Sequence, residues 1–170
     1  MPEPAKIRNV AVVGHRGTGK TSLVEALLFQ SGASNRLGTV EAGTTISDSD
    51  EDEHKRQLSI SISLEHATWQ ERKLNLVDVP GDPSFQGELR TAARVVEGAL
   101  VTVSGVMGVE VGTARAWKLA DDLGLARVVF VNMLDRERFL AAGFDDYISK
   151  PVNIVELVGT VRQYCDGRGR

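Results

Sequence analysis

The sequence has little of several features that mark other classes of protein. Its single cysteine, Cys165, excludes an internal disulfide and is typical of a reducing compartment. No apolar run approaches the roughly 20 residues that a membrane-spanning helix needs. The 20 Lys and Arg residues stand against 23 Asp and Glu, for a net charge of -3, which gives no electrostatic footprint for general nucleic-acid binding. The first residues, MPEPAKIRN, lack the apolar core of a signal peptide, so we expect a cytoplasmic protein that contacts no membrane.

What the sequence does have is a regular alternation of strand-like and helix-like segments. Its 170 residues are 42% hydrophobic, which is enough for a single domain (1–170) with its own core. The alternation predicts an α/β fold of three α/β/α layers, with a mostly parallel sheet of about six strands and ligands at the carboxyl ends of the strands. We expect strands at 9–14, 58–64, 73–78, 99–105, 126–134 and 145–150, and helices at 20–32, 88–98, 111–124, 136–143 and 153–164.

One strand shows strict alternation. Leu58, Ile60, Ile62 and Leu64 share one face of the segment LSISISL, and three serines share the other. This pattern predicts a half-buried strand at the edge of the sheet. The preceding segment, 33–57, shows no periodicity and contains a dense acidic run, which predicts a mobile loop.

The stretch GHRGTGKTS, 14–22, lies between the first strand and the first helix and matches the pattern G-x-x-x-x-G-K-[ST]. Its glycines let the backbone wrap so that successive N–H groups face phosphate oxygens, and the positive end of the following helix adds to this attraction. Lys20 can reach the terminal phosphates, in a catalytic as well as a binding role, and the Thr21 hydroxyl can ligate Mg²⁺. For His15, phosphate contact and simple solvent exposure both stay open. The predicted nucleotide-binding residues of this cradle are Gly14, His15, Arg16, Gly17, Thr18, Gly19, Lys20, Thr21 and Ser22.

The segment DVPG supplies a second element of the site. Asp78 ends a predicted strand, where its carboxylate could support Mg²⁺ through water. Gly81 could offer its N–H to the γ-phosphate of a nucleotide. The pattern D-x-x-G is weak alone, but after a phosphate cradle and at a strand end it favours a functional interpretation.

These motifs carry a family resemblance. Residues 1–138 resemble the G domain of a translational GTPase, closest to elongation factor G and its paralogues, through GHRGTGKTSLVEALL, DVPGDPSF, ELRTAARVVEGAL and VVFVNMLDRER. The resemblance implies a P-loop nucleotide-binding fold, GTP or GDP with Mg²⁺ at the cradle, and mobile switch segments around the γ-phosphate.

Three positions depart from the family pattern. The first-switch threonine aligns with Ser59, whose hydroxyl can still bind Mg²⁺. The histidine that positions the attacking water is replaced by Asp82, the candidate catalytic residue there. Its acidic group would repel the γ-phosphate and polarise the water differently, so we expect slow GTP hydrolysis at most. The guanine-reading motif is NMLD, in which Asn132 and Asp135 remain but Met133 replaces the lysine that packs along the base and ribose. We therefore expect weaker nucleotide binding with guanine preference partly kept.

The end of the chain resembles a different family. Residues 139–165, with AAGFDDY and SKP, are similar to the C-terminal part of a CheY-like response-regulator receiver domain, which has a flavodoxin-like fold. That resemblance implies a phosphoryl-contacting role for Lys150 and a cis Lys150–Pro151 bond. Ser149 and Lys150 also fall where GTPases contact the guanine base, although plain solvent exposure is the alternative.

We interpret the two resemblances as an engineered chimera, with a GTPase-like part at 1–138, a receiver-like part at 139–170 and a junction near 136–139. The alternatives are a structural hybrid that tests fold relatedness and has little activity, or a phosphoacceptor receiver domain. The receiver's acidic cluster and acceptor aspartate are missing from their expected places, which disfavours the last. Ribosome binding is not expected, because the sequence lacks further domains for it, and the oligomeric state stays open.

Overall fold

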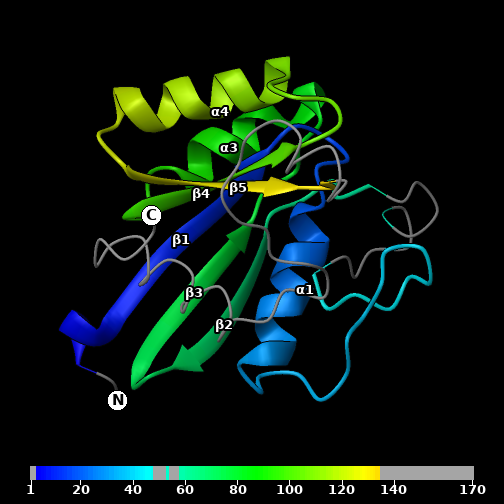
Figure 1. The fold of residues 1–170 in the computed structure, drawn as a ribbon. Helices are drawn as coiled ribbons and strands as arrows, with labels where there is room; N and C mark the ends of the chain where they lie inside the picture. Colours follow the sequence, from blue (N-terminus) through cyan, green and yellow to red (C-terminus); the bar gives the residue numbers. More distant parts are fainter. Residues whose placement is uncertain (1–2, 48–52, 54–57, 135–170) are drawn as a thin grey trace, which may run out of the picture. The chain divides into compact units, whose positions relative to one another are not determined.

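The computed structural model describes residues 3–47, 53 and 58–134. In this part of the chain, a five-stranded sheet has the strand order β2-β3-β1-β4-β5 (Figure 1). All neighbouring strands are parallel except β2 and β3, which form an antiparallel hairpin. The strands are β1 (Ile7–Gly14), β2 (Ser63–Trp69), β3 (Arg72–Asp78), β4 (Gly98–Ser104) and β5 (Ala126–Asn132); the helices are η1 (Pro4–Lys6), α1 (Lys20–Gln30), η2 (Pro83–Phe85), α3 (Gln86–Ala92) and α4 (Val111–Asp122).

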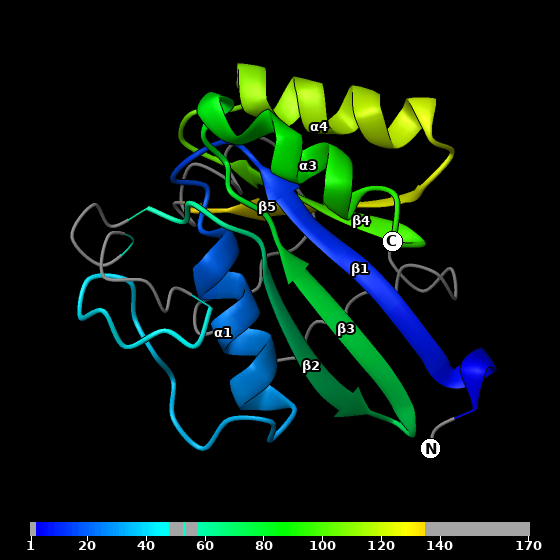
Figure 2. The ribbon, with the colours of Figure 1, turned by 180° about the vertical axis from the view of Figure 1, so that it is seen from behind.

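Helices cover both faces of this sheet. Figures 1 and 2 show α1 on one face and α3 and α4 on the other. The strand β1 is apolar on both sides for this reason: Val12 packs with α1, while Ala11 and Val13 pack with α3 and α4. The predicted three-layer α/β fold with a mostly parallel sheet is confirmed. The strand and helices predicted after residue 134 lie outside the described residues.

The parallel strands bring their carboxyl ends to one edge of the sheet. Gly14, Asp78, Ser104 and Asn132 end β1, β3, β4 and β5 respectively. The loops that follow these four residues therefore meet at the same edge, which is where open α/β sheets bind ligands.

The edge strand is partly different from the prediction. It does lie at the sheet edge, but it begins at Ser63 instead of Leu58, and Leu64 is 66% exposed. Ala67 is buried instead. It lies on the opposite face of the strand from Leu64, which we had expected to be buried. The hairpin turn at Gln70 and Glu71 pairs Trp69 with Arg72 and so sets the register of β2 against β3. Because a shift of one residue reverses the two faces of a strand, this register decides that Leu64 faces outward.

Other segments agree with the sequence in outline. The helix expected at 88–98 is α3, which is displaced toward the N-terminus and ends at Ala92. No helix or strand forms in 33–47, as the lack of periodicity predicted, whereas most of the acidic run that follows lies outside the described residues. Among the described helices, none is both long and apolar enough to cross a membrane.

Candidate functional site

The loop between β1 and α1 has the geometry of the predicted cradle. Its turn relies on Gly17 and Gly19, which have φ angles of 77° and 84°, in the left-handed region that glycine adopts without strain. Gly19 is also the residue before α1, so the amino end of that helix opens directly into the loop.

Buried polar groups from two neighbouring strands hold this loop from below. The Thr18 hydroxyl, fully buried, lies 2.7 Å from the Thr102 hydroxyl of β4 and 2.9 Å from the His15 carbonyl oxygen. The Asn132 side chain, at the end of β5, donates from Nδ2 to the Thr18 carbonyl oxygen at 2.8 Å. A Cβ atom at Gly19 would overlap Asn132 Nδ2, so only glycine fits above this contact. The cradle is therefore a rigid part of the sheet edge and not a free loop.

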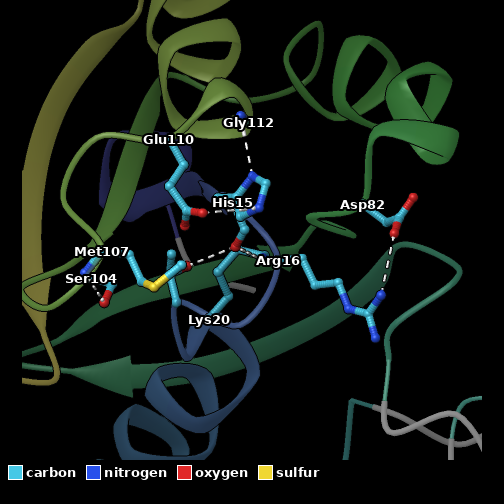
Figure 3. A network of polar contacts seen from close by, with 9 residues as sticks. His15, Arg16, Lys20, Asp82, Ser104, Met107, Glu110 and Gly112 are labelled. Carbon is cyan, nitrogen blue, oxygen red and sulfur yellow. Dashed lines mark hydrogen bonds and ion pairs between the residues drawn. The ribbon is translucent and has the colours of Figure 1, made fainter.

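Lys20 extends along the inside of the loop. Its Nζ donates to the His15 carbonyl oxygen at 3.0 Å, and the residue is 7% exposed (Figure 3). A Cβ atom at Gly81 would overlap Lys20 Nζ and lie 2.8 Å from the backbone nitrogen of Arg16. The DVPG turn thus touches the cradle, and glycine at position 81 is what permits this approach.

The three residues predicted to hold Mg²⁺ come together. Thr21 Oγ1 donates to Asp78 Oδ2 at 2.7 Å and lies 3.1 Å from Ser59 Oγ, although the three residues are far apart in the sequence. Asp78 is 2% exposed. Two hydroxyls and one carboxylate form an all-oxygen donor set, which suits Mg²⁺ with water and phosphate as its other ligands. Among the described residues, no group of three or more His, Cys, Asp or Glu side chains could hold a metal ion instead.

A cavity of about 200 Å³ opens over these groups. The cradle, the segments at Val40 and Ser59, and the residues Gly81 and Met133 all line this open cavity. Met133 has a φ of 57° and is 41% exposed. The lining residues are Arg16, Gly17, Gly19, Lys20, Thr21, Ser22, Val40, Glu41, Leu58, Ser59, Gly81 and Met133.

His15 points away from this cavity. Its Nδ1 accepts a hydrogen bond from the Gly112 N–H at 3.3 Å, and its Nε2 lies 3.4 Å from Glu110 Oε1 (Figure 3). Neither of the two alternatives that the sequence left open describes this arrangement. The imidazole links the cradle to the start of α4, and only the backbone of His15 faces Lys20.

Asp82 follows Gly81 and caps the short helix η2. Its Oδ1 accepts from the Ser84 N–H at 2.9 Å, and its Oδ2 lies 3.8 Å from Arg16 Nη1. The Ser84 hydrogen bonds, with a smaller contribution from the Arg16 charge, hold the pKa of Asp82 below its usual range. The carboxylate is therefore ionised and engaged by the turn and by Arg16.

A second acidic residue, which the sequence reasoning missed, organises the segment after α1. Glu25 is 1% exposed; its Oε2 accepts from the Gly38 N–H at 3.2 Å, and its Oε1 accepts from the Ile46 N–H. Both ends of the 38–46 loop are thereby attached to one carboxylate. The available signal was a charged residue next to the apolar positions that form the buried face of the helix.

The remaining predicted residues divide into two groups. Asn132 is placed beneath the cradle, where it contacts backbone and lines no part of the cavity. Asp135, Ser149, Lys150 and the cis Lys150–Pro151 bond lie outside the described residues. The sequence reasoning also missed Thr102 and Glu110; a polar threonine within the buried run ALVTV was the one usable signal for the first.

Comparisons with known proteins agree on one family. Residues 5–161 match the family described as "Elongation factor Tu GTP binding domain". The chain is 34% identical over 152 residues to "Ribosome-releasing factor 2, mitochondrial" from Candida albicans and 36% identical over 135 residues to "Elongation factor G" from Granulibacter bethesdensis. A solved structure of a Thermus thermophilus protein matches with a TM-score of 0.75 and 42% identity, and the match covers 81% of this chain and 22% of that chain.

The matches cover most of this chain but a small share of the relatives. They include 89% and 79% of this chain, but 18% and 20% of the two curated proteins. The chain therefore spans about a fifth of the length of these relatives. The family match also runs to residue 161, across the junction predicted near 136–139, which gives the predicted chimera no support.

Proposed function

We propose that this chain, which belongs to the elongation factor Tu GTP-binding domain family, binds GTP and GDP at residues 14–22 with Mg²⁺ held beside Thr21. The observation that carries the proposal is the meeting of the glycine cradle with the cluster of Thr21, Ser59 and Asp78 under one cavity. A polyphosphate needs backbone donors, a cation and a metal-binding oxygen set at one place. The sheet edge supplies all three.

Each group has a separate task in this proposal. The amino end of α1 and the loop N–H groups bind the phosphate oxygens, and Lys20 leaves the His15 carbonyl to neutralise the terminal phosphate. Thr21 and Ser59 offer hydroxyl oxygens to Mg²⁺, while Asp78 orients the Thr21 hydroxyl by its hydrogen bond. When bound, Mg²⁺ neutralises charge that develops on the phosphates.

GTP hydrolysis by this site is slow in our proposal. Asp82 stands where the family usually has a histidine, and its carboxylate is engaged by the Ser84 N–H and by Arg16. An ionised carboxylate also repels the γ-phosphate, so it is a poor group for orienting water beside that phosphate. Guanine selectivity rests on Asp135, outside the described residues, whereas Met133, in place of the family's lysine, lowers the nucleotide affinity.

The macromolecular partners and the cellular location of the protein are less closely defined than its ligand. The printed names of the relatives include a ribosome-releasing factor and an elongation factor, so our expectation that the ribosome is not a partner loses its support. A cytoplasmic location stays a prediction, and one of these relatives is named as mitochondrial. The receiver-like ending is not part of the proposed function.

A calorimetric titration tests the proposal. With Mg²⁺ present, GDP should bind saturably and ADP should bind more weakly. Lys20→Ala should remove binding, whereas Lys118→Ala, in an exposed residue of α4, should leave it as in the wild type. Equal binding of GDP and ADP would refute guanine recognition, and GDP binding that survives in Lys20→Ala would refute the assigned site.

A further inference from the structure

We propose that Arg16 determines how strongly the site prefers GTP over GDP, by exchanging its partner Asp82 for the third phosphate of GTP. The inference rests on the proposed nucleotide function and adds a specificity-determining residue to it. With GDP, the Arg16 guanidinium pairs with Asp82; with GTP, the same guanidinium binds the additional phosphate and the pair is released.

The position of Arg16 allows both partners. It belongs to the cradle and lines the cavity with Gly17 and Lys20, while its side chain is 55% exposed. Figure 3 shows the side chain extending from the loop toward Asp82. A long, half-exposed arginine side chain loses little packing when its guanidinium moves toward the cavity that the residue already lines.

The existing ion pair is weak enough to be exchanged. Arg16 Nη1 and Asp82 Oδ2 lie 3.8 Å apart, which is longer than a hydrogen bond. Exposed ion pairs of this kind contribute little, because solvent screens both charges. Phosphate oxygens form shorter, charge-assisted and often bidentate hydrogen bonds with a guanidinium, so the third phosphate is the stronger partner.

Asp82 is the fixed member of the pair. Its carboxylate caps η2 through the Ser84 N–H at 2.9 Å and is 20% exposed. The preceding residue, Gly81, lies against Arg16 and Lys20 with no room for a Cβ atom. The third phosphate therefore attracts Arg16 and repels Asp82 at the same time, and both effects separate the pair.

This competition predicts a specific non-additivity. In the wild type, binding the third phosphate costs the Arg16–Asp82 pair as well as the repulsion from Asp82. Removing the Asp82 charge abolishes both costs when Arg16 is present, but only the repulsion when Arg16 is absent. The effect of Asp82→Asn must therefore be larger in the presence of Arg16.

The test measures the ratio of the affinities for a non-hydrolysable GTP analogue and for GDP, with Mg²⁺, in the full chain. The variants are Asp82→Asn, Arg16→Gln and their combination; asparagine keeps a side-chain oxygen that can cap η2 through Ser84. We expect Asp82→Asn to raise the ratio and Arg16→Gln to lower it. The rise should be about 1.4- to fivefold greater with Arg16 than with glutamine at that position, the range that exposed ion pairs span.

Two controls separate this role from a structural one. A variant that only disturbs the fold changes both affinities together and leaves their ratio constant. Arg72→Gln, an exposed residue at the start of β3 and the far end of that strand from Asp78, should also leave the ratio unchanged. Arg16→Lys, which keeps the charge but loses the planar fork, should fall between the wild type and Arg16→Gln.

The outcomes distinguish the inference from the function beneath it. If the wild type binds both nucleotides but Asp82→Asn changes the ratio equally in both backgrounds, Arg16 and Asp82 do not compete and the inference is wrong, while the nucleotide site stands. If the wild type binds neither nucleotide, the proposed function and the inference are both overturned.

Discussion

The hydrogen bond from Asn132 to the cradle gives the sharpest test of the structure. Asn132→Asp is nearly isosteric, but it replaces the Nδ2 donor, 2.8 Å from the Thr18 carbonyl oxygen, with an oxygen. At this position, with 4% exposure, an ionised carboxylate faces another acceptor and lacks the donor that it needs. A protonated carboxyl, by contrast, can donate to Thr18 in place of the amide.

Proton linkage fixes the size and the sign of the effect. A free aspartate has a pKa of about 3.9, so protonating the introduced carboxyl at pH 7 costs about 4 kcal/mol, which is the upper limit of the destabilisation. The carboxyl's pKa is raised in the folded state, so the variant loses stability as pH rises. The penalty should be about 2–4 kcal/mol at pH 7 and should fall by up to about 1.4 kcal/mol for each unit of lower pH, until it is small near pH 4.

Urea unfolding of the wild type and the variant at several pH values measures this difference. Subtracting the wild-type curve removes the pH dependence of all other groups, provided that both proteins unfold in two states. Asn132→Ala serves as the control, because it loses the same hydrogen bond without introducing a titratable group. If Asn132→Asp and Asn132→Ala lose equal stability at every pH, then the amide does not face the Thr18 carbonyl and this description of the cradle is wrong.

Three further changes address other parts of the molecule. Glu97→Gln should cost less than about 1 kcal/mol at pH 7, because Glu97 accepts from both nitrogens of Asn9 (2.6 and 2.9 Å) but is exposed, so solvent screens its charge. These hydrogen bonds lower its pKa, so the loss should shrink in urea unfolding below about pH 4. Met133→Lys should raise GDP affinity in calorimetry by up to about tenfold, because a cation and a longer stem enter the cavity, whereas Met133→Leu should not; equal affinities for both variants would contradict this. Gly38→Ala should destabilise the fold by about 1–3 kcal/mol, since its Cβ would overlap the backbone carbonyl oxygen of Thr44 and lie 2.8 Å from Glu25 Oε2. Gly87→Ala, with open space around it, should not destabilise it, and the same unfolding assay compares the two.

Local patterns predicted the parts of the site that belong to one segment. The spacing of Gly14, Gly19, Lys20 and Thr21 placed the cradle between a strand and a helix, because the motif and its flanking elements are encoded within about twenty residues. Asp78 was placed correctly at a strand end by the same kind of reasoning.

The contacts that fix the site came from distant segments and could not be predicted in this way. Thr18 meets Thr102 across 84 positions and Asn132 across 114, and these contacts depend on the strand order and register. Asn132 was predicted to bind nucleotide, and in the structure its side chain contacts the cradle backbone. The neighbours of His15 and Asp82 were not foreseen for a similar reason, since Glu110, Gly112 and Arg16 come from other segments or depend on the fold of the loop.

The carboxylate of Glu25 allows the 38–46 loop to change in length. Its two oxygens accept the Gly38 and Ile46 amides, so one side chain holds both ends of the loop, and hydrogen bonds between Thr39 and Thr44 close the loop a second time inside these ends. Closing a longer flexible loop between fixed ends costs only about 0.6 kcal/mol for each doubling of its length. The turn between Thr39 and Thr44 is therefore a natural place for insertions, such as a recognition tag or a fluorescent reporter, beside the cavity that Val40 and Glu41 help to line.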